Sequence, residues 1–373
     1  MRKYFYLRLD DYIYTASNQF DFKSKHGTDQ CIYILKEIID CYKQLNGTVF
    51  VCYLDASKAF DRINHAKLFT KLHDRGVPYY IVRLLVFWYT KQRFSIRWGN
   101  EYSSTFNVTN GVRQGGILSP YLFNIYFDDL SSSLNGICCG CVSNNSIVNH
   151  LMYADDLVLL SPSLSGLQNL VNTCKSFADT HDVIFNAEKS ACMIFRPKGF
   201  NGDICTSIFI NDDMVPVVTH TKYLGHIISN TLSDHLDIQR QVKQLYIQGN
   251  ILLRKFYMCS VNVKVKLFQS YCSPMYSTHL WWNYSNAEIR KLYIAYHNVF
   301  KILLGFSKYD SNGLLCTIFN VRSCAAVIRN HVYKFMKRLS ESTNMLLRNI
   351  ANTSLIYTSR IRKHWMKLLY VNS

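Results

Sequence analysis

The spacing of apolar residues predicts a chain of mixed helices and strands. Apolar side chains recur at helical spacing over 28–45 and again over 164–180, so we expect a helix in each range. An unbroken β-branched and aromatic run at 48–54 is typical of a short buried strand, and it leads straight into Asp55. The segment 150–160 is apolar on both sides of two adjacent acids, which predicts two strands joined by a tight turn.

Capping and turn residues set the limits of further elements. Asn64 is a suitable N-cap for a helix that stops at Gly76. Ser119 is a second N-cap, with Pro120 at the first helical position, for a helix that we expect to run to about Leu134. The other expected elements are an apolar helix from 79 to about 92, a hairpin of 94–98 with 103–109 about Gly99-Asn100, and strands at 192–195, 208–210, 215–218 and 223–228.

Positive charge is concentrated in the last third of the chain. The net charge is +17, and residues 235–373 hold 20 of the 42 basic residues but only 4 of the 25 acidic ones. The apolar pattern of this segment is helical, which predicts a helical basic region after a domain boundary near 230–236. Such a one-sided excess favours a polyanionic partner such as nucleic acid, the alternative being a solvated basic surface.

Cysteine usage and hydropathy indicate an intracellular protein. The 13 cysteines are scattered along the sequence without a recognisable secretory leader, which is typical of reduced thiols. Cys138, Cys139 and Cys141 are close together, but no second cysteine pair follows at zinc-site spacing, so a zinc knuckle is disfavoured. No apolar run in the sequence is long enough to cross a bilayer.

Two acidic sites are distinguished by their apolar surroundings. Of the four Asp-Asp pairs, only Asp155-Asp156 has apolar residues on both flanks, and Asp55 ends a strand apolar enough to be central. Carboxylates in such places lose hydration unless a cation or a hydrogen-bond donor compensates them. Two interpretations stay open: a shared pair of divalent ions that activates a hydroxyl nucleophile, or buried acids satisfied by arginine or backbone groups.

Several longer motifs resemble the reverse transcriptases of non-LTR (LINE-type) retrotransposons. The first two catalytic motifs of that family are similar to LDASKAFD at 54–61 and GVRQGGILSP at 111–120, and its metal-binding turn is similar to YADD at 153–156. A fingers element resembles QFDF at 19–22, and the primer-gripping hairpin resembles YLG at 223–225. The motifs stand in the family's order and spacing, and the resemblance covers about 19–340.

The resemblance implies a right-hand polymerase fold within the α/β (α+β) class. We expect partial fingers at 1–46, a palm with an antiparallel sheet at 47–234 and a helical basic thumb at 235–373. The implied function is an RNA-directed DNA polymerase that uses an RNA template, a DNA primer and deoxynucleoside triphosphates. The implied location is the nucleus, and the sequence does not indicate an oligomeric state. The short segment before residue 19 leaves the fingers incomplete, and no endonuclease domain is recognisable in the sequence.

The same resemblance assigns metal ligands and an acid catalyst. It implies that Asp55, Asp155 and Asp156, with the backbone of Ala56, hold two Mg²⁺ ions, or Mn²⁺ in their place. Lys189 stands where the family places a lysine that protonates the leaving pyrophosphate. The alternative for this lysine is a surface position in a turn.

Four residues are implied to contact the nucleotide. Phe60 would crowd a ribose 2′-hydroxyl, or alternatively pack in the core. Gln114 would touch the incoming nucleotide or the template, and Gly115, which lacks a Cβ atom, lets the backbone come close to it. For Arg113, a phosphate partner and a carboxylate partner within the palm are equally open.

The thumb assignments and two competing functions complete the expectations. Trp281-Trp282 either stack on bases or, as we favour, pack against the protein. Asp21 departs from the family pattern, which has glycine at this position. The competing functions are a catalytically impaired nucleic-acid-binding remnant and a two-metal nuclease. Phosphate contacts in the thumb are expected from Arg254-Lys255, Lys264, Lys266 and Lys337-Arg338.

Overall fold

The computed structural model describes residue 12, residues 14–144, 146–197 and 199, and residues 207–352 and 359–370. The chain forms two compact units, each built from two separate stretches: Met1–Cys31 with Asn46–Val218, and Ile32–Leu45 with Thr219–Ser373. The units therefore divide after Val218 and not near 230–236, because the segments on either side of that expected boundary pack together. The assignment of fingers, palm and thumb stays a prediction.

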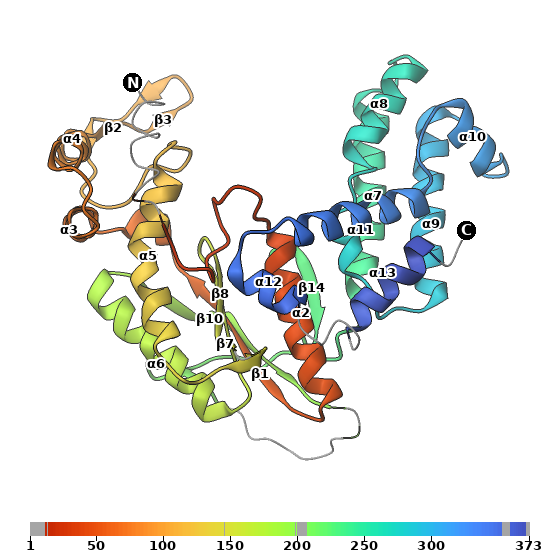
Figure 1. The fold of residues 1–373 in the computed structure, drawn as a ribbon. Helices are drawn as coiled ribbons and strands as arrows, with labels where there is room; N and C mark the ends of the chain where they lie inside the picture. Colours follow the sequence, from red (N-terminus) through yellow and green to blue (C-terminus); the bar gives the residue numbers. More distant parts are fainter. Residues whose placement is uncertain are drawn as a thin grey trace. The chain divides into compact units, whose positions relative to one another are not determined.

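A four-stranded antiparallel sheet forms the centre of the first unit, as the apolar runs predict. Its strands, in spatial order, are β10 (Phe185–Phe195), β1 (Val49–Ala56), β9 (Asp156–Ser161) and β8 (His150–Tyr153). Nearly every residue of β1 is buried, and this explains why its sequence is apolar without alternation. Helix α6 (Leu164–His181) packs on this sheet, and α5 (Ser119–Asn135) packs on α6 (Figure 1).

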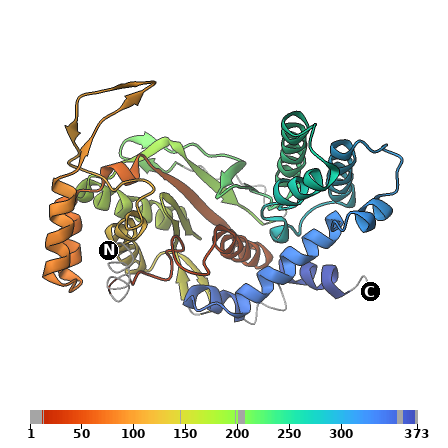
Figure 2. The ribbon, with the colours of Figure 1, turned by 90° about the horizontal axis from the view of Figure 1, so that it is seen from above.

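The helices that precede α5 lead into a projecting hairpin. Helix α3 (His65–Asp74) is capped as predicted, because the Asn64 side chain accepts a hydrogen bond from the Lys67 N–H. Helix α4 (Tyr79–Thr90) follows, and the next strands turn at Gly99-Asn100 and extend away from the helices of their unit (Figure 2).

The start of α5 differs from the expected cap. Leu118 is the N-cap, so Ser119 is already the first helical residue and Pro120 is the second. The Ser119 hydroxyl is hydrogen-bonded to the phenol of Tyr89, which leaves it no role as a cap. The helix itself ends at Asn135, one residue after the expected end.

The segment that carries the expected fingers motif lies along β8. The Phe20 N–H donates to the Met152 carbonyl at 3.0 Å, and the Met152 N–H donates to the Asn18 carbonyl at 2.9 Å. The Asn124 side chain, from α5, donates to the Asp21 carbonyl at 3.0 Å. These bonds attach residues 18–21 beside the turn that carries Asp155.

The second unit is helical and has its own apolar core. Helices α7 (His235–Lys255) and α9 (Asn286–Leu304) pack along each other, and a hairpin of β13 (His220–Tyr223) and β14 (His226–Ser229) contacts α7. We expected one strand at 223–228. The chain instead turns back at Leu224-Gly225, where both residues have positive φ.

Helix α2 (Thr28–Gln44) is held in the second unit by a buried ion pair. The Lys36 Nζ lies 2.6 Å from Asp234 Oδ1, and both side chains are almost fully buried. The other Asp234 oxygen accepts the N–H groups of Trp282 and Asn283, each at 2.8 Å. Tyr33 of the same helix stacks on Trp365, with ring centroids 5.6 Å apart. These contacts explain why most of α2 groups with the C-terminal helices.

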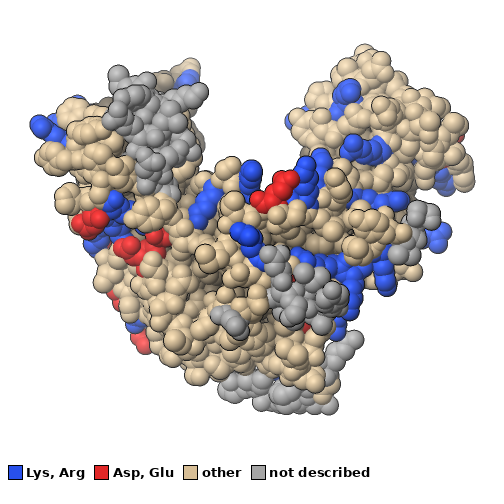
Figure 3. Space-filling view, in the orientation of Figure 1, with Lys and Arg blue, Asp and Glu red and all other residues tan. Residues whose placement is uncertain are grey.

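Helix α11 (Cys324–Ser340) adds buried side chains to the core of the second unit, and most of the remaining elements are short. Over the second unit, basic side chains outnumber acidic ones on the face drawn in Figure 3, in line with the charge count. The segment 215–218, expected as a strand, makes only a bridge from Val217 to Cys192. The other elements are η2 (Ala59–Arg62), β2 (Arg93–Phe94), β3 (Arg97–Trp98), β4 (Glu101–Tyr102), β5 (Phe106–Asn107), β6 (Cys141–Ser143), β7 (Ser146–Val148), β11 (Phe209–Ile210), β12 (Asp213–Met214), α8 (Val261–Tyr271), η3 (Thr278–Leu280), α10 (Asn312–Ile318), α11 (Cys324–Ser340), α12 (Met345–Asn352) and α13 (Arg360–Tyr370).

Candidate active site

The three predicted metal-binding acids lie at the ends of adjacent strands. Asp55, near the end of β1, stands directly opposite Asp156, the first residue of β9. Opposite residues of an antiparallel pair have Cβ atoms roughly 4.5–5.5 Å apart and side chains on the same face. Asp155 occupies the preceding turn together with Ala154, which has φ 53°. Pairing of the strands therefore brings the two motifs to one edge of the sheet.

These carboxylates act on one another through their charges. Loss of hydration, with the negative charges of Asp155 and Asp55, raises the pKa of Asp156 to about 6. In the described part of the chain, no arginine or lysine forms an ion pair with any of the three acids. Asp155 and Asp156 are exposed and Asp55 is partly buried, so the interpretation of buried acids satisfied by arginine or backbone groups does not describe the pair at 155–156. The Ser190 hydroxyl accepts the Asp55 N–H at 3.1 Å and fixes the end of β1.

The donor set at this edge fits a hard divalent cation. Mg²⁺ takes oxygen ligands, usually one or two carboxylates completed by substrate phosphates and water. A cation would offset the repulsion from Asp155 and Asp55, which adds to the loss of hydration in raising the pKa of Asp156. Within the described ranges, no three His, Cys, Asp or Glu side chains already form a metal-ready cluster, at this edge or around Cys138. Metal binding by the acids stays a prediction.

Phe60 lies on η2, shortly after the end of β1. Its ring stacks on Phe123 with centroids 4.2 Å apart and an angle of 13°, so one face is packed as the alternative interpretation expected. The side chain is still partly exposed and is available to a ligand. The Phe60 carbonyl accepts the Val112 N–H at 2.8 Å, which ties η2 to the loop that carries the second motif.

That loop holds the other predicted nucleotide contacts. The Arg113 guanidinium lies 4.9 Å from the centroid of the Phe94 ring, and no carboxylate in the described ranges pairs with it. A palm carboxylate is therefore not its partner there, and the phosphate alternative stays a prediction. Gln114 and Gly115 are exposed, and Gly115 has φ +80° with open space on the side where a Cβ atom would stand.

Lys189 lies at the same end of the sheet as the acids. It belongs to β10, whose Asn186 stands opposite Asp55. The pairing shifts register between Tyr53 and Asp55, so several residues of β10, Lys189 among them, bulge away from β1. The Lys189 N–H donates to the Asn186 side chain at 3.0 Å, and its own side chain is exposed. Its role as an acid stays a prediction.

The sequence can be compared with known families once this geometry is established. The family described as Reverse transcriptase (RNA-dependent DNA polymerase) matches residues 1–228, which is more than half of the chain. The chain belongs to the reverse transcriptase family. The predicted resemblance is thus confirmed.

Relatives of this reverse transcriptase include proteins of insect mobile elements. The RNA-directed DNA polymerase from mobile element jockey of Drosophila funebris is 24% identical and covers 92% of this chain and 38% of the relative. The Pol polyprotein of the R2DM element of Drosophila melanogaster is 33% identical over 47% of this chain and 17% of its own length. The chain therefore spans less than half the length of these curated relatives. A telomerase structure from Candida tropicalis covers 94% of this chain and 60% of its own, with 12% identity and a TM-score of 0.48.

One residue near the reverse transcriptase acids was noted in the sequence only as a departure from the family. Asp21 is 1% exposed, and its carboxylate accepts the N–H of Ala154, in the turn that precedes Asp155. Burial raises the pKa of Asp21 to about 6. Its Oδ2 atom has no hydrogen-bond partner in the described residues. Asp21 therefore supports the acidic turn at a cost in stability whenever it is ionised.

We expect the stability of the Asp21→Asn variant, relative to that of the native protein, to increase as the pH rises. The folded pKa of Asp21 lies above that of the unfolded chain, so its penalty is absent below about pH 4 and complete above about pH 6. The variant's free energy of unfolding, relative to the native protein, should rise by about 2–3 kcal/mol between pH 4 and pH 7.5. Urea unfolding at both pH values measures this change, and an unchanged difference would contradict the assignment.

We also expect Gly111→Ala to loosen the loop that carries the second motif of the reverse transcriptase. Gly111 has φ +88°, and a Cβ atom there would lie 2.8 Å from the Asp61 backbone. Strain and clash together should cost about 2–4 kcal/mol in thermal or urea unfolding. Gly99→Ala is the control, because Gly99 has φ +62° but open space around it, and it should cost only about 1–2 kcal/mol. Equal losses in the two variants would contradict this account.

No helix in the described ranges has both the length and the apolarity that crossing a bilayer requires.

Proposed function

We propose that this chain catalyses RNA-directed DNA synthesis, adding deoxynucleotides to the 3′-hydroxyl of a DNA primer on an RNA template. The observation that carries the proposal is the alignment of Asp55 with Asp156 at one sheet edge, beside Asp155, with their charges acting on each other. Family membership supplies the reaction class. A location in the nucleus follows from the same resemblance and is part of the proposal.

Each side chain has a defined part in this reaction. Asp55, Asp155 and Asp156, with the Ala56 backbone, would hold two Mg²⁺ ions, which when bound lower the pKa of the primer hydroxyl and neutralise phosphate charge. The exposed part of Phe60 borders the nucleotide position and excludes a ribose 2′-hydroxyl by its volume.

Two basic side chains would act on the phosphates during the same step. Arg113 donates to the triphosphate of the incoming nucleotide. The exposed ammonium group of Lys189 donates a proton to the leaving pyrophosphate.

The second unit supplies surfaces for the duplex. A cavity of about 440 Å³ lies between the β13–β14 hairpin and helices α7 and α8, and its wall includes Lys222 and Arg240. The exposed Lys222 beside the hairpin suits the phosphates of a primer strand, whereas Arg240 is already paired with Asp237. Trp281 does not take part, because it is 2% exposed and donates from its indole N–H to Asp237. This tryptophan packs against the protein, as expected.

A primer-extension experiment tests the proposal. The full chain is incubated with a DNA primer annealed to an RNA template, the four deoxynucleotides and Mg²⁺. We expect template-dependent lengthening of the primer that stops when either Mg²⁺ or the deoxynucleotides are omitted. The absence of lengthening, with duplex binding retained, would contradict the proposal and favour a catalytically impaired binding protein.

The same experiment separates polymerase from nuclease. A two-metal nuclease shortens the primer or template with Mg²⁺ alone and has no use for deoxynucleotides. The exposed Gln114 and Gly115 favour the polymerase, because both residues are accessible to a nucleotide and no atom of the described residues, apart from its chain neighbours, lies within 4 Å of the Cβ position of Gly115. We therefore expect no shortening in the reaction without deoxynucleotides.

A further inference from the structure

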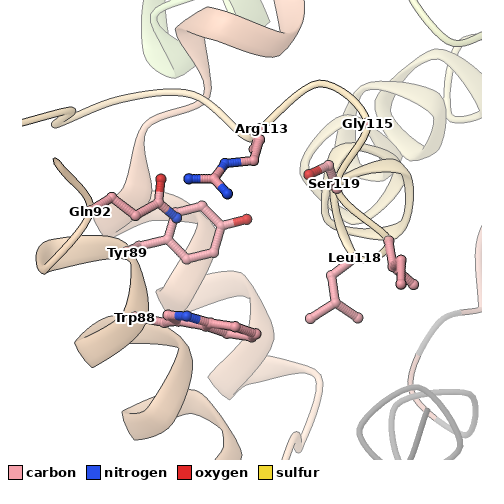
Figure 4. A pocket seen from close by; sticks show the side chains of 9 residues that line it. Trp88, Tyr89, Gln92, Arg113, Gly115, Leu118 and Ser119 are labelled. Carbon is pink, nitrogen blue, oxygen red and sulfur yellow. The ribbon is translucent and has the colours of Figure 1, made fainter. Parts of the chain in front are cut away.

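The first unit contains a pocket that none of the three acids lines. It lies between the end of α4 and the loop that leads into α5, and its volume is about 250 Å³ (Figure 4). This is slightly less than the roughly 300–1,000 Å³ of pockets that take drug-sized ligands, so it suits a single planar ring system. The side chains that line the pocket include Trp88, Tyr89, Gln92, Arg113, Leu118 and Ser119.

One wall of the pocket is aromatic and partly open. Tyr89 points into the core and is 6% exposed, whereas its neighbour Trp88 is 45% exposed. Figure 4 shows the Trp88 indole edge-on, with its end directed toward Leu118 and one face turned toward the side of the space where Tyr89 and Arg113 lie. An indole face that meets solvent at a pocket offers a stacking surface for another flat ring.

The polar groups around that surface are available to a ligand. The Gln92 side chain makes no hydrogen bond to any residue in the described ranges, and an amide can donate and accept at once. The Arg113 guanidinium is directed over the pocket in Figure 4, where its contact is with the Phe94 ring. The hydroxyl groups of Tyr89 and Ser119, which also line the pocket, are hydrogen-bonded to each other.

We infer that this pocket binds an unpaired nucleobase of a single-stranded nucleic acid. The base stacks on Trp88, and its edge bonds to the Gln92 amide. Arg113 is assigned to the incoming nucleotide, and no other cation of the described residues lines the pocket, which favours a base whose strand is held elsewhere over a second free nucleotide. The inference rests on the proposed function in one respect only: that function identifies nucleic acid as the class of partner.

Tryptophan fluorescence tests the pocket directly. The full chain, without Mg²⁺, is titrated with an eight-nucleotide oligoadenylate, an abasic strand of the same length and dATP. We expect the oligoadenylate to quench Trp88, so that the quenching is lost in Trp88→Phe and kept in Trp98→Phe. Trp98 is the matched control because it is 86% exposed on the hairpin of the same unit. Equal quenching by dATP alone at the same concentration would overturn the assignment to a strand.

Affinity measurements provide a second readout. Loss of one stacked base should weaken oligoadenylate binding about 10- to 100-fold in Trp88→Ala, and leave the weaker binding of the abasic strand unchanged. Trp98→Ala should bind like the native protein. Oligoadenylate binding by a folded Trp88→Ala protein within twofold of native would overturn the inference. Gln92→Ala should reduce oligoadenylate binding several-fold. Because Gln92 is only partly buried, this variant replaces Trp88→Ala in the comparison with the native protein if Trp88→Ala does not fold.

Failure of this inference can be distinguished from failure of the proposed function. Native-like binding by Trp88→Ala together with normal primer extension overturns the pocket assignment alone. Quenching of Trp88 by the strand without primer extension supports the pocket and contradicts the polymerase.

Discussion

Asp155→Asn is expected to abolish primer extension while the protein still folds and binds duplex. The substitution removes a charged oxygen ligand from the site where two cations would neutralise phosphate charge. Loss of several kcal/mol of that stabilisation lowers the rate by about a thousandfold or more. Asp55→Asn should behave in the same way, because Asp55 faces Asp156 on the neighbouring strand. The rate of primer extension, measured under single-turnover conditions at saturating Mg²⁺, gives the size of this loss.

Asp212→Asn is the matched control for this loss. Asp212 belongs to another Asp-Asp pair and is exposed in the turn between β11 and β12. We expect it to extend primers at the native rate. Asp155→Asn should also be no less stable than the native protein without Mg²⁺, because it removes a like charge beside Asp156. A primer-extension rate of Asp155→Asn within tenfold of the native rate would contradict the assignment of Asp155 as a metal ligand.

The second large effect is expected on stability, from Asp237→Asn. Asp237 is fully buried, and its carboxylate accepts the indole N–H of Trp281 at 2.8 Å, the Arg240 Nε–H at 2.7 Å and the Ile227 N–H at 3.0 Å. The Nδ1 atom of His226 lies 3.1 Å from it. An amide cannot accept all of these bonds, and it leaves the Arg240 guanidinium without a counter-charge. We expect a loss of about 3–5 kcal/mol in the free energy of unfolding.

The pH dependence of this loss identifies its origin. Burial alone would raise the pKa of Asp237, but the hydrogen bonds and charges of His226 and Arg240 hold it well below its ordinary value. Because the pKa of Asp237 is lower in the folded protein than in the unfolded chain, its ionised form stabilises the fold. This stabilisation is complete above the pKa of the unfolded chain and is lost as the pH falls below about 4. The gap between native and variant should therefore be constant from pH 5 to 8 and narrow in acid. Glu341→Gln, at an exposed ion pair of 3.8 Å with Lys337, should cost less than about 0.5 kcal/mol.

Local pattern predicted most of the elements but not how they group. The periodicity of α2, the apolar run of β1 and the Asn64 cap each depend on neighbouring residues, and the structure agrees with them. The membership of α2 in the second unit depends on Lys36 meeting Asp234, 198 residues away in sequence. No short window of sequence contains that information.

The sequence likewise predicted some features of the candidate site and not others. Motif spacing predicted that Asp55 and the Asp155-Asp156 pair would meet, and strand pairing brings Asp55 opposite Asp156. No local pattern indicated that Asp21 accepts the Ala154 N–H, or that Trp88 and Gln92 line a pocket with the second motif. These contacts arise where loops and helix ends from separate motifs are packed together, and sequence periodicity does not describe such places.

The late partners of α2 have a consequence for biosynthesis. Lys36 leaves the ribosome well before Asp234 and before Leu280, whose carbonyl it also contacts 244 residues further on. At about 5–20 residues per second, the nascent helix waits on the order of ten to fifty seconds before its lysine finds a counter-charge. During that interval its apolar face is exposed, which makes it a natural client for a holding chaperone.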